Sequence, residues 1–273
     1  MLLRIILILG LFVFLSSCSK NKPLYEPTLK IDPYKTYNEG LKAFKDNQYF
    51  LASKKFSESE INFTIPRLAA KSAIMSSYSF YGINFYDEAE ENLIRYLKTY
   101  PGDTYVMYAH YLLAIIYFEQ IADEKNDLKP LLDAKEKIDF FLKKYPSSEY
   151  AIDLNLKKNL VQNQFAAREL YIAKFYISVQ KWVPAINRLK LIVNDYNDTV
   201  FVEEALHRLI EIHYHVGLED EAKKYASILG YNYNSGKWFE ESYKVLNKDY
   251  KSVLSNKPKK EKKILKKIID MIK

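Results

Sequence analysis

The chain has 273 residues, a formal net charge of +7 and a single cysteine, so no disulfide forms within it and apolar burial must hold the fold. Residues 257–273 contain eight lysines against Glu261 and Asp270, so almost all of the net positive charge belongs to one appendage. This argues against a basic surface spread over the fold, and therefore against nucleic acid as a partner.

Residues 1–17 have the layout of a bacterial secretory signal. One positive charge, Arg4, precedes an apolar run over residues 5–15, and two small serines follow that run, which is the order typical of a signal peptide. A permanent membrane-spanning helix needs roughly 20 apolar residues, so this run is too short to be an anchor. We therefore predict that residues 1–17 are a signal peptide that is removed.

Leu15-Ser16-Ser17-Cys18 resembles the lipobox of bacterial lipoproteins, in which the cysteine receives fatty acyl chains such as palmitate and begins the mature protein. The resemblance implies that Cys18 is the lipidation site and that acyl chains hold the protein on a membrane. Ser19, the next residue, implies the outer membrane, with the protein facing the periplasm. The alternative is a stray cysteine in an ordinary signal peptide. Residues 18–33 contain three prolines and are predicted to be a lipid-proximal tether.

Beyond the tether, apolar residues recur at helical spacing and glycine is rare, which predicts an all-α protein. Five segments share an alanine at their fifth position, and four of them have a larger apolar residue one turn later. These alanines are Ala52, Ala89, Ala134, Ala185 and Ala222. A small residue at a fixed point lets two antiparallel helices pack closely, so the segments resemble the second helices of tetratricopeptide repeats.

The first helices of the same units agree with this register. Their expected small residue falls at Gly40, Ser77, Ala114, Ala173 and, less well, Ile210. The third and fourth units exceed the standard length of ~34 residues, with an inserted loop at 123–129 and a lengthened helix at 150–170. We therefore predict a tetratricopeptide-repeat solenoid of about five helix pairs, with repeats 1–3 over residues 34–150 and repeats 4–5 over residues 151–250.

Several motifs narrow the family further. Behind the lipobox and the tether come Y-N-E-G-L-K-A-F at 37–44, K-K-Y-P-S-S-E-Y-A at 143–151, W-V-P-A-I-N-R-L at 182–189 and L-G-Y-N-Y at 229–233. In this order they resemble the BamD family of outer-membrane lipoproteins. The chain departs from the family at Asn197, where the repeat turn commonly has a proline, and in its lysine-rich C-terminus.

The resemblance implies a subunit of the β-barrel assembly (BAM) complex, which assembles β-barrel proteins and inserts them into the outer membrane. The implied partners are BamA, other subunits of the complex and unfolded outer-membrane β-barrel proteins. The alternative is a tetratricopeptide-repeat scaffold lipoprotein for cell-wall, division or pilus machinery. Copurification of a large β-barrel protein would favour the first function, and copurification of a cell-wall synthase or pilus secretin would favour the second.

Tetratricopeptide solenoids bind ligands on a concave face lined by their first helices. In the register above, this face is aromatic only in the first three repeats, at Tyr34, Tyr37, Phe44, Tyr78, Tyr81, Tyr108, Tyr111 and Phe118. Tyrosine combines a large rigid apolar face with a hydroxyl that water can reach, which suits varied peptides. We therefore predict a substrate-peptide groove in this half. The alternative is that these rings only pack between helices.

The last two repeats mix charged with apolar residues. Arg188, Glu203, Glu204, Arg208 and Glu211 are predicted to form a partner surface, and the family resemblance implies that this half contacts BamA. Ordinary solvated helix faces are the alternative. Residues 251–273 form a basic amphipathic tail, with Ile264, Ile268 and Ile272 on its apolar stripe. Such a tail binds a membrane surface or a partner's groove, or it remains a solvated extension.

No catalytic, cofactor or metal site is predicted. The sequence has no phosphate-binding loop and no serine-hydrolase elbow. His213 and His215 lie two positions apart, so they point to different faces of a helix, and the carboxylate and histidine spacing of a metal enzyme is missing. We therefore predict that the protein is not an enzyme and that it needs neither cofactor nor metal.

Overall fold

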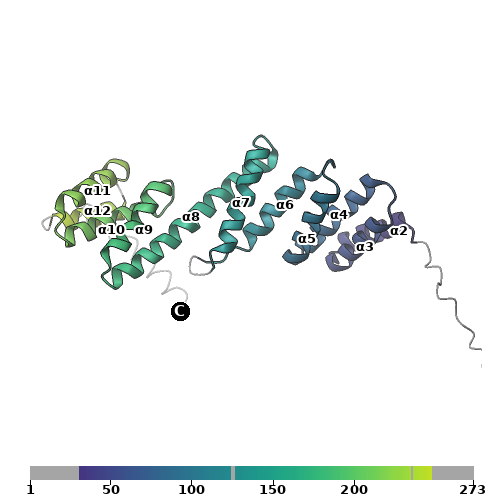
Figure 1. Ribbon diagram of the computed structural model, residues 1–273, viewed down its shortest axis with the longest axis horizontal. Helices are drawn as coiled ribbons and strands as arrows, with labels where there is room; N and C mark the ends of the chain where they lie inside the picture. Colours follow the sequence, from purple (N-terminus) through teal and green to yellow (C-terminus); the bar gives the residue numbers. More distant parts are fainter. Residues whose placement is uncertain (1–30, 124–126, 235, 248–273) are drawn as a thin grey trace, which may run out of the picture.

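A computed structural model describes residues 31–123, 127–234 and 236–247. In these ranges the protein has eleven helices and no strand, which confirms the all-α prediction, and the helices stack into an elongated body (Figure 1). Five consecutive pairs form: α2 (Pro33–Lys45) with α3 (Tyr49–Asn62), α4 (Pro66–Tyr81) with α5 (Tyr86–Thr99), α6 (Val106–Glu119) with α7 (Lys129–Lys144), α8 (Glu149–Ser178) with α9 (Trp182–Asp195), and α10 (Val202–His215) with α11 (Glu219–Asn232). A single helix, α12 (Lys237–Leu246), follows them.

The repeat register read from the sequence holds in all five pairs. The marker alanines of the second helices, Ala52, Ala89, Ala134, Ala185 and Ala222, are all fully buried. On the first helices, Ser77, Ala114, Ala173 and Ile210 are buried as well. At Gly40, a Cβ would come within 2.9 Å of the Phe56 ring, so the first pair requires a glycine at its crossing point.

Four of the five pairs turn through one residue in the left-handed backbone region. These residues are Asn47, Asn84, Gln180 and Gly217, with φ angles of 59°, 60°, 57° and 81°. Asparagine and glycine adopt this region more readily than other residues. The third pair has instead a longer connection from Glu119 to Lys129, in agreement with the predicted insertion, although residues 124–126 lie outside the described chain.

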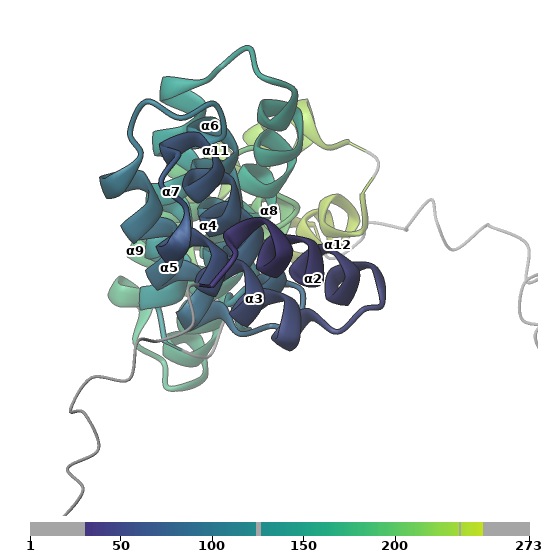
Figure 2. The same cartoon turned by 90° about the vertical axis from the view of Figure 1, so that its right-hand side faces the viewer.

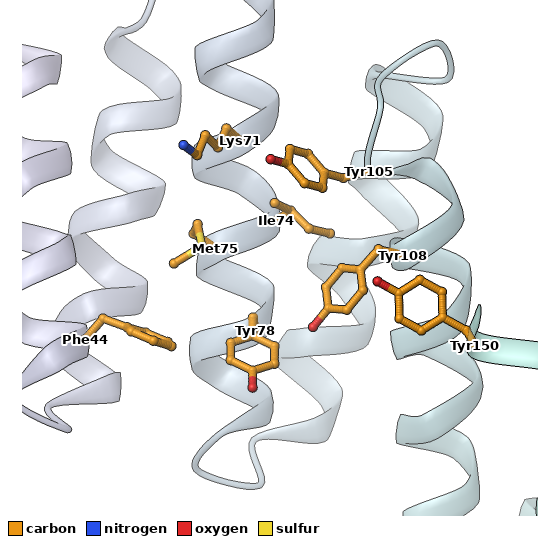
Figure 3. Close-up of a pocket in the computed structure, with 8 residues that line it drawn as sticks. All are labelled: Phe44, Lys71, Ile74, Met75, Tyr78, Tyr105, Tyr108 and Tyr150. Atoms are coloured by element: carbon orange, nitrogen blue, oxygen red, sulfur yellow. The ribbon is translucent and has the colours of Figure 1, made fainter. Parts of the chain in front are cut away.

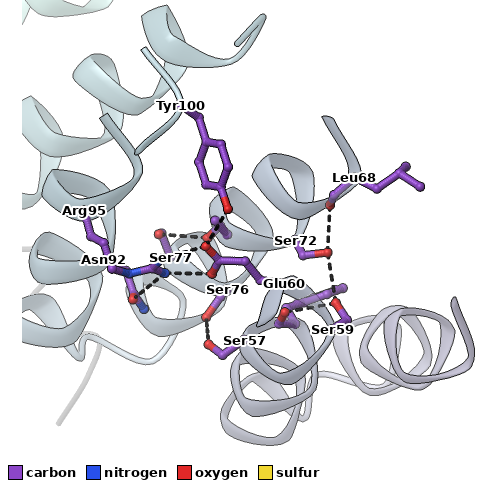
Figure 4. Close-up of polar contacts among 12 residues, drawn as sticks. Ser57, Ser59, Glu60, Leu68, Ser72, Ser76, Ser77, Asn92, Arg95 and Tyr100 are labelled. Carbon is purple, nitrogen blue, oxygen red and sulfur yellow. Dashed lines mark hydrogen bonds and ion pairs between the residues drawn. The ribbon is translucent and has the colours of Figure 1, made fainter. Parts of the chain in front are cut away.

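The contact between α3 and α4 is made largely of serines. The Ser76 hydroxyl donates to the Ser53 carbonyl at 3.0 Å and lies 2.8 Å from the Ser57 hydroxyl. One turn away, the Ser59 hydroxyl donates to that of Ser72 at 2.9 Å (Figure 4). Buried hydroxyls must find partners, and here each helix supplies them to the other. Small side chains therefore allow close packing without leaving polar groups unpaired.

Glu60, at the end of the same seam, ties the first repeat to the second. Its side chain is only 6% exposed. Arg95 of α5 donates two hydrogen bonds to its carboxylate, at 2.5 and 2.7 Å, and the Tyr100 hydroxyl donates a third at 3.1 Å (Figure 4). A buried carboxylate is tolerated only with such pairing, so these contacts fix the two repeats relative to each other.

Helix α8 belongs to both halves of the molecule. It has 30 residues, which confirms the lengthening predicted at 150–170 and corresponds to about 45 Å. Near its start, Leu154 and Val161 join the apolar core formed with α6 and α7. Near its end, Leu170 and Ala173 join the core formed with α9 and α10. One continuous helix thus connects the N-terminal repeats to the C-terminal repeats (Figure 1).

Helix α12 is an element that the sequence did not predict. It packs against α10 and α11, in the place that the first helix of a sixth repeat would take. The Ser242 hydroxyl lies 2.8 Å from Nδ1 of His207, and the Trp238 ring packs on the His207 ring with centroids 5.1 Å apart. The five predicted pairs therefore end in an additional helix.

Several sequence predictions fall outside the described residues. These are the signal peptide at 1–17, the lipidation site Cys18, most of the tether at 18–33 and the whole tail at 251–273. Among the helices of the described ranges, none combines the length and the hydropathy needed to cross a membrane.

Candidate functional site

A cavity of about 400 Å³ opens between the first helices of the N-terminal repeats. It is lined by Phe44, Lys71, Ile74, Met75, Tyr78, Tyr105, Tyr108 and Tyr150. In Figure 3 the rings of Tyr78, Tyr108 and Tyr150 come from three successive first helices, and Lys71 and Tyr105 lie further along the cavity. Five aromatic rings and a single charge line this space, so it suits an apolar ligand that has aromatic side chains.

Contacts between rings hold the lining in place. Tyr78 lies 5.8 Å from Phe44 and 6.4 Å from Tyr108, measured between ring centroids. Tyr108 in turn lies 5.9 Å from Tyr150, and Tyr111 stacks on Tyr150 at 4.5 Å. Such pairs contribute about 0.5–1.5 kcal/mol each beyond the area that they bury. The rings therefore orient one another before any ligand arrives.

Tyr108 of the cavity and the adjoining Tyr111 have raised pKa values, so both phenols stay neutral at ordinary pH. Burial, followed by the neighbouring Tyr78 and Tyr150, raises the pKa of Tyr108 above its usual value. Burial also raises the pKa of Tyr111, and so does its hydrogen bond to Asp153, to which the phenol donates at 3.0 Å. Neutral hydroxyls can both donate and accept hydrogen bonds, so the lining offers polar contacts to a peptide backbone without adding negative charge.

The structure places the predicted groove residues in two groups, one at the cavity and one away from it. Phe44, Tyr78 and Tyr108 line the cavity. Tyr81 and Tyr111 are not among the lining residues, but each contacts one of them: Tyr81 lies 6.1 Å from Tyr78, and Tyr111 lies 6.1 Å from Tyr108. These five residues form one connected aromatic cluster.

The other three predicted groove residues lie elsewhere. Tyr34 and Tyr37 contact the ring of Phe63, beyond the end of α3, at 5.1 and 6.3 Å. Phe118 belongs to the core of α6, α7 and α8, and the Lys157 ammonium lies 5.0 Å from its ring centre. Packing between helices, the alternative that the sequence left open, describes Tyr37 and Phe118, whereas the Tyr34 ring is 54% exposed at the N-terminal end of the solenoid.

Lys71 and Ile74 occupy groove positions of the predicted repeat register, whereas three other lining residues were not predicted. Tyr150 stands in the first turn of α8, among the turns that lengthen this helix, so a register counted from Ala173 does not reach it. Tyr105 precedes α6 but follows the spacing Tyr105-x-x-Tyr108-x-x-Tyr111, and that periodicity was available as a signal. Met75 is the neighbour of a predicted position and enters the cavity beside it.

In the C-terminal half, four of the predicted partner-surface residues lie on α10. Arg208 donates to Glu211 at 2.6 Å and reaches Glu204 at 3.5 Å. Glu204 also pairs with Lys174 of α8 at 2.7 Å. Burial acts to raise the pKa of Glu211, but hydrogen bonds from His207 and Arg208 outweigh it, so the pKa lies below its usual value. Glu204, Arg208 and Glu211 are therefore engaged in ion pairs rather than freely solvated.

Helix α12 covers part of this charged surface. The Arg208 guanidinium lies over the Trp238 ring, 5.5 Å from its centre. The Glu203 carboxylate packs so closely against Gly236 that a Cβ there would collide with it. Both charged side chains are half-buried at the contact between α10 and α12, so a partner would meet them together with α12.

Arg188 lies apart from the other four residues. It donates to Glu169 of α8 at 2.9 Å, within the seam between α8 and α9. Of the five residues predicted as a partner surface, Arg188 is on α9 and pairs with α8, and the other four are on α10.

The histidines serve packing in this structure. His213 Nδ1 lies 2.7 Å from the Leu209 carbonyl, and its ring contacts Tyr225 at 5.3 Å. His207 lies 3.3 Å from Glu211 and is capped by α12. Across the described ranges, no cluster of three or more histidine, cysteine, aspartate or glutamate side chains is arranged to hold a metal ion.

Comparison with known proteins places these features in a family. The model of the YfiO family, described as outer membrane lipoprotein, matches residues 30–229, which is most of the chain. The chain belongs to this outer membrane lipoprotein family. All residues that line the cavity, and the whole of α10, lie within the matched range, whereas α12 lies beyond its end.

Three relatives of the chain are each named outer membrane protein assembly factor BamD. The chain is 32% identical to outer membrane protein assembly factor BamD of Rickettsia prowazekii over 251 residues, which cover 92% of this chain and 98% of the relative. It is 35% identical to the BamD of Caulobacter vibrioides over 192 residues, which cover 70% of this chain and 63% of that protein. The BamD of Neisseria gonorrhoeae is 25% identical over 190 residues, 66% of this chain and 71% of that protein. These findings confirm the family resemblance read from the motifs.

Proposed function

We propose that this protein is an outer-membrane protein assembly factor of the BAM complex. In this proposal the N-terminal cavity binds segments of unfolded β-barrel proteins, and the C-terminal half binds BamA and further subunits. The protein acts as an adaptor and carries out no catalysis. The names of the relatives favour this function over a scaffold for cell-wall, division or pilus machinery.

The open aromatic cavity is the observation that carries the substrate part of the proposal. Strands of outer-membrane barrels alternate apolar and polar residues and carry aromatic residues near the membrane interfaces. The five rings of the lining can accept apolar side chains from one face of such a strand. The tyrosine hydroxyls can bond the peptide backbone, which is the same in every client and therefore allows varied sequences.

The paired charges of α10 support the partner part of the proposal. Glu204, Arg208 and Glu211 are partly buried and already oriented by one another, so little side-chain freedom remains to be lost when a partner binds. Because α12 covers one side of them, the proposed BamA surface consists of α10 together with α12. Arg188 would contribute separately, at the seam of α8 and α9.

The membrane part of the proposal rests on the family and on the front of the chain. The family is described as outer membrane lipoprotein, and Cys18 directly follows the segment with signal-peptide layout. We therefore propose acylation at Cys18, with the solenoid in the periplasm. Mass spectrometry of the purified mature protein would detect the acyl chains, and an unmodified Cys18 would contradict this part.

Photo-crosslinking at single positions tests the substrate part. Benzoylphenylalanine placed at Tyr150, inside the cavity, should crosslink to peptides from the strands of a barrel protein. The same group at Tyr231, which is 88% exposed at the end of α11, is the matched control and should crosslink weakly. Equal crosslinking at the two positions would contradict peptide binding in the cavity.

Copurification tests the partner part separately. BamA should be recovered with both crosslinker variants, because neither change touches α10 or α12. Recovery of a cell-wall synthase or a pilus secretin in place of a large β-barrel protein would contradict the proposed complex.

A further inference from the structure

The N-terminal end of the solenoid exposes several large apolar side chains along one edge. Ile31, Tyr34, Ile61 and Ile65 are 39%, 54%, 82% and 45% exposed, and we call this set the N-terminal rim. The terminal repeat of a solenoid usually has a polar outer face that keeps it soluble. Apolar side chains gathered at such an end instead mark a surface that contacts something else.

The rim is built from three chain segments that meet at the same edge. Helix α2 begins at Pro33, α3 ends at Asn62 and α4 begins at Pro66, and these helices pack antiparallel in succession. The Tyr34 ring meets the Phe63 ring edge-on at 5.1 Å, which joins the start of α2 to the loop after α3. Figure 2 views the molecule from this end, with α2 and α3 in front.

The charges of the rim favour an anionic surface. Within residues 31–35 and 61–67 the charged side chains are Asp32, Lys35 and Arg67. Asp32 is used locally, because its carboxylate accepts a hydrogen bond from the Tyr34 backbone N–H at 3.0 Å and caps α2. Lys35 and Arg67 are exposed, and neither forms an ion pair with another residue of the described chain. Basic side chains beside tyrosine and isoleucine are typical of contact with a phospholipid headgroup layer.

We propose that the N-terminal rim rests on the lipid surface to which the protein is anchored. This proposal depends on the lipid-anchor part of the proposed function and adds an orientation to it. Cys18 precedes Ile31 by thirteen residues, which span at most about 45 Å when fully extended. A tether of this reach holds the rim at a high effective concentration near the membrane, so a contact that is weak by itself becomes populated.

The contact would fix where the cavity lies. Helix α4 starts in the rim at Pro66 and carries Lys71 and Ile74 of the cavity only one to two turns later, about 8–12 Å along the helix axis. A rim on the headgroups therefore holds the peptide cavity directly beside the membrane, and the remainder of the solenoid extends from that point.

Depth-dependent fluorescence quenching tests the proposal. Because Cys18 is the only cysteine, a chain that begins at residue 19 has none and accepts one new label site. The chain from residue 19 to residue 273 would carry an N-terminal hexahistidine tag and be tethered to vesicles of phosphatidylethanolamine and phosphatidylglycerol through a nickel-chelating lipid. An environment-sensitive fluorophore is attached at Ile61→Cys in the rim, or at Leu51→Cys, which is 45% exposed near the other end of α3 and serves as the matched control.

We expect spin-labelled phospholipid to quench the fluorophore at position 61 about threefold more strongly than at position 51, because the two sites lie about 15 Å apart along α3. Equal quenching at both positions, or none at either, would overturn the rim contact. The nickel tether makes this result independent of acylation. Absence of acyl chains on Cys18, or of barrel partners, would contradict the proposed function. The quenching comparison could still be interpreted in either case.

Discussion

Helices α4 and α10 occupy the same place in their repeats but have opposite surface chemistry. The alanines Ala89 and Ala222 mark this register, and they stand 133 positions apart. Four residues of the cavity, Lys71, Ile74, Met75 and Tyr78, correspond in order to Glu204, His207, Arg208 and Glu211. The first four line an open space, whereas the second four pair with one another and are partly covered by α12. One backbone position can therefore serve a peptide cavity or a partner surface, depending on the side chain it carries.

The seams beneath the two helices differ as well. Ser72, Ser76 and Ser79 of α4 correspond to Ala205, Leu209 and Ile212 of α10, and all six residues are buried. The contact of α4 with α3 includes hydrogen bonds between serines of the two helices, whereas α10 has apolar side chains at the corresponding positions. Small or well-fitting residues therefore allow close helix packing at both places in the solenoid. Hydrogen bonds contribute to the stability of one contact, and apolar burial contributes to the stability of the other.

The largest expected effect breaks the apolar seam. Leu209→Ala should lower the free energy of unfolding by about 3 kcal/mol, because it leaves a cavity in a fully packed core. Ser76→Ala, the matched change in the polar seam, should cost only about 1 kcal/mol for its lost hydrogen bonds. Urea unfolding followed by circular dichroism measures both. Equal losses at the two positions would contradict the difference between the seams.

A second change transfers the chemistry of α10 into α4. Tyr78→Glu places the acid of the corresponding α10 position in the cavity, and it should reduce the yield of barrel-peptide crosslinks at Tyr150 about tenfold, roughly 1.4 kcal/mol of binding. The cause is a charge introduced among apolar rings, where it would lose hydration. Tyr231→Glu, at an exposed position of α11, is the control. Retained crosslinking in the Tyr78→Glu protein with unaltered helicity would contradict the role of this ring.

The smallest effect concerns pH. The folded-state pKa of Glu211 lies below its usual value, although burial opposes the shift, because His207 and Arg208 bond the carboxylate. A depressed carboxyl pKa contributes stability above the unfolded value of about 4.3, and that contribution is lost as pH falls through the lower folded value. The side chain is 37% exposed, so solvent screening keeps the term well below about 1 kcal/mol.

Thermal unfolding between pH 5 and pH 3 measures this term. Glu211→Gln should flatten part of the acid-induced decrease in melting temperature, whereas Tyr78→Phe in the corresponding position of α4 should leave the pH profile unaltered. An identical profile for the Glu211→Gln protein and the unmodified protein would contradict the contribution of the α10 ion pairs.

Most of the fold could be predicted from the sequence because its repeat has a physical marker. Alanine or another small residue is required wherever two helices cross closely, so positions such as Ala89 and Ala185 reveal the register without any knowledge of longer-range contacts. The same register gave the aromatic positions Phe44, Tyr78 and Tyr108 of the cavity. These residues are set by local helical periodicity alone.

The rest depends on contacts that a regular register cannot express. Tyr150 reaches the cavity only because α8 is longer than a standard repeat helix, and its added turns run beside α6 and α7. Tyr34 leaves the groove because Phe63 offers it a ring at the end of α3. Helix α12 has no alanine marker. It packs on α10 through contacts of Trp238 and Ser242 with His207, and the sequence of α12 alone does not predict these tertiary contacts.

Helix α8 has a mechanical consequence for the two halves. Its first turn supplies Tyr150 to the cavity, and its last turns supply Leu170 and Ala173 to the C-terminal core. A flexible loop between the halves would absorb a displacement of one end. An unbroken helix of about 45 Å is rigid and transmits that displacement to its other end. A ligand that displaces Tyr150 therefore also shifts the packing around Ala173, which lies far from the cavity in which the ligand is bound.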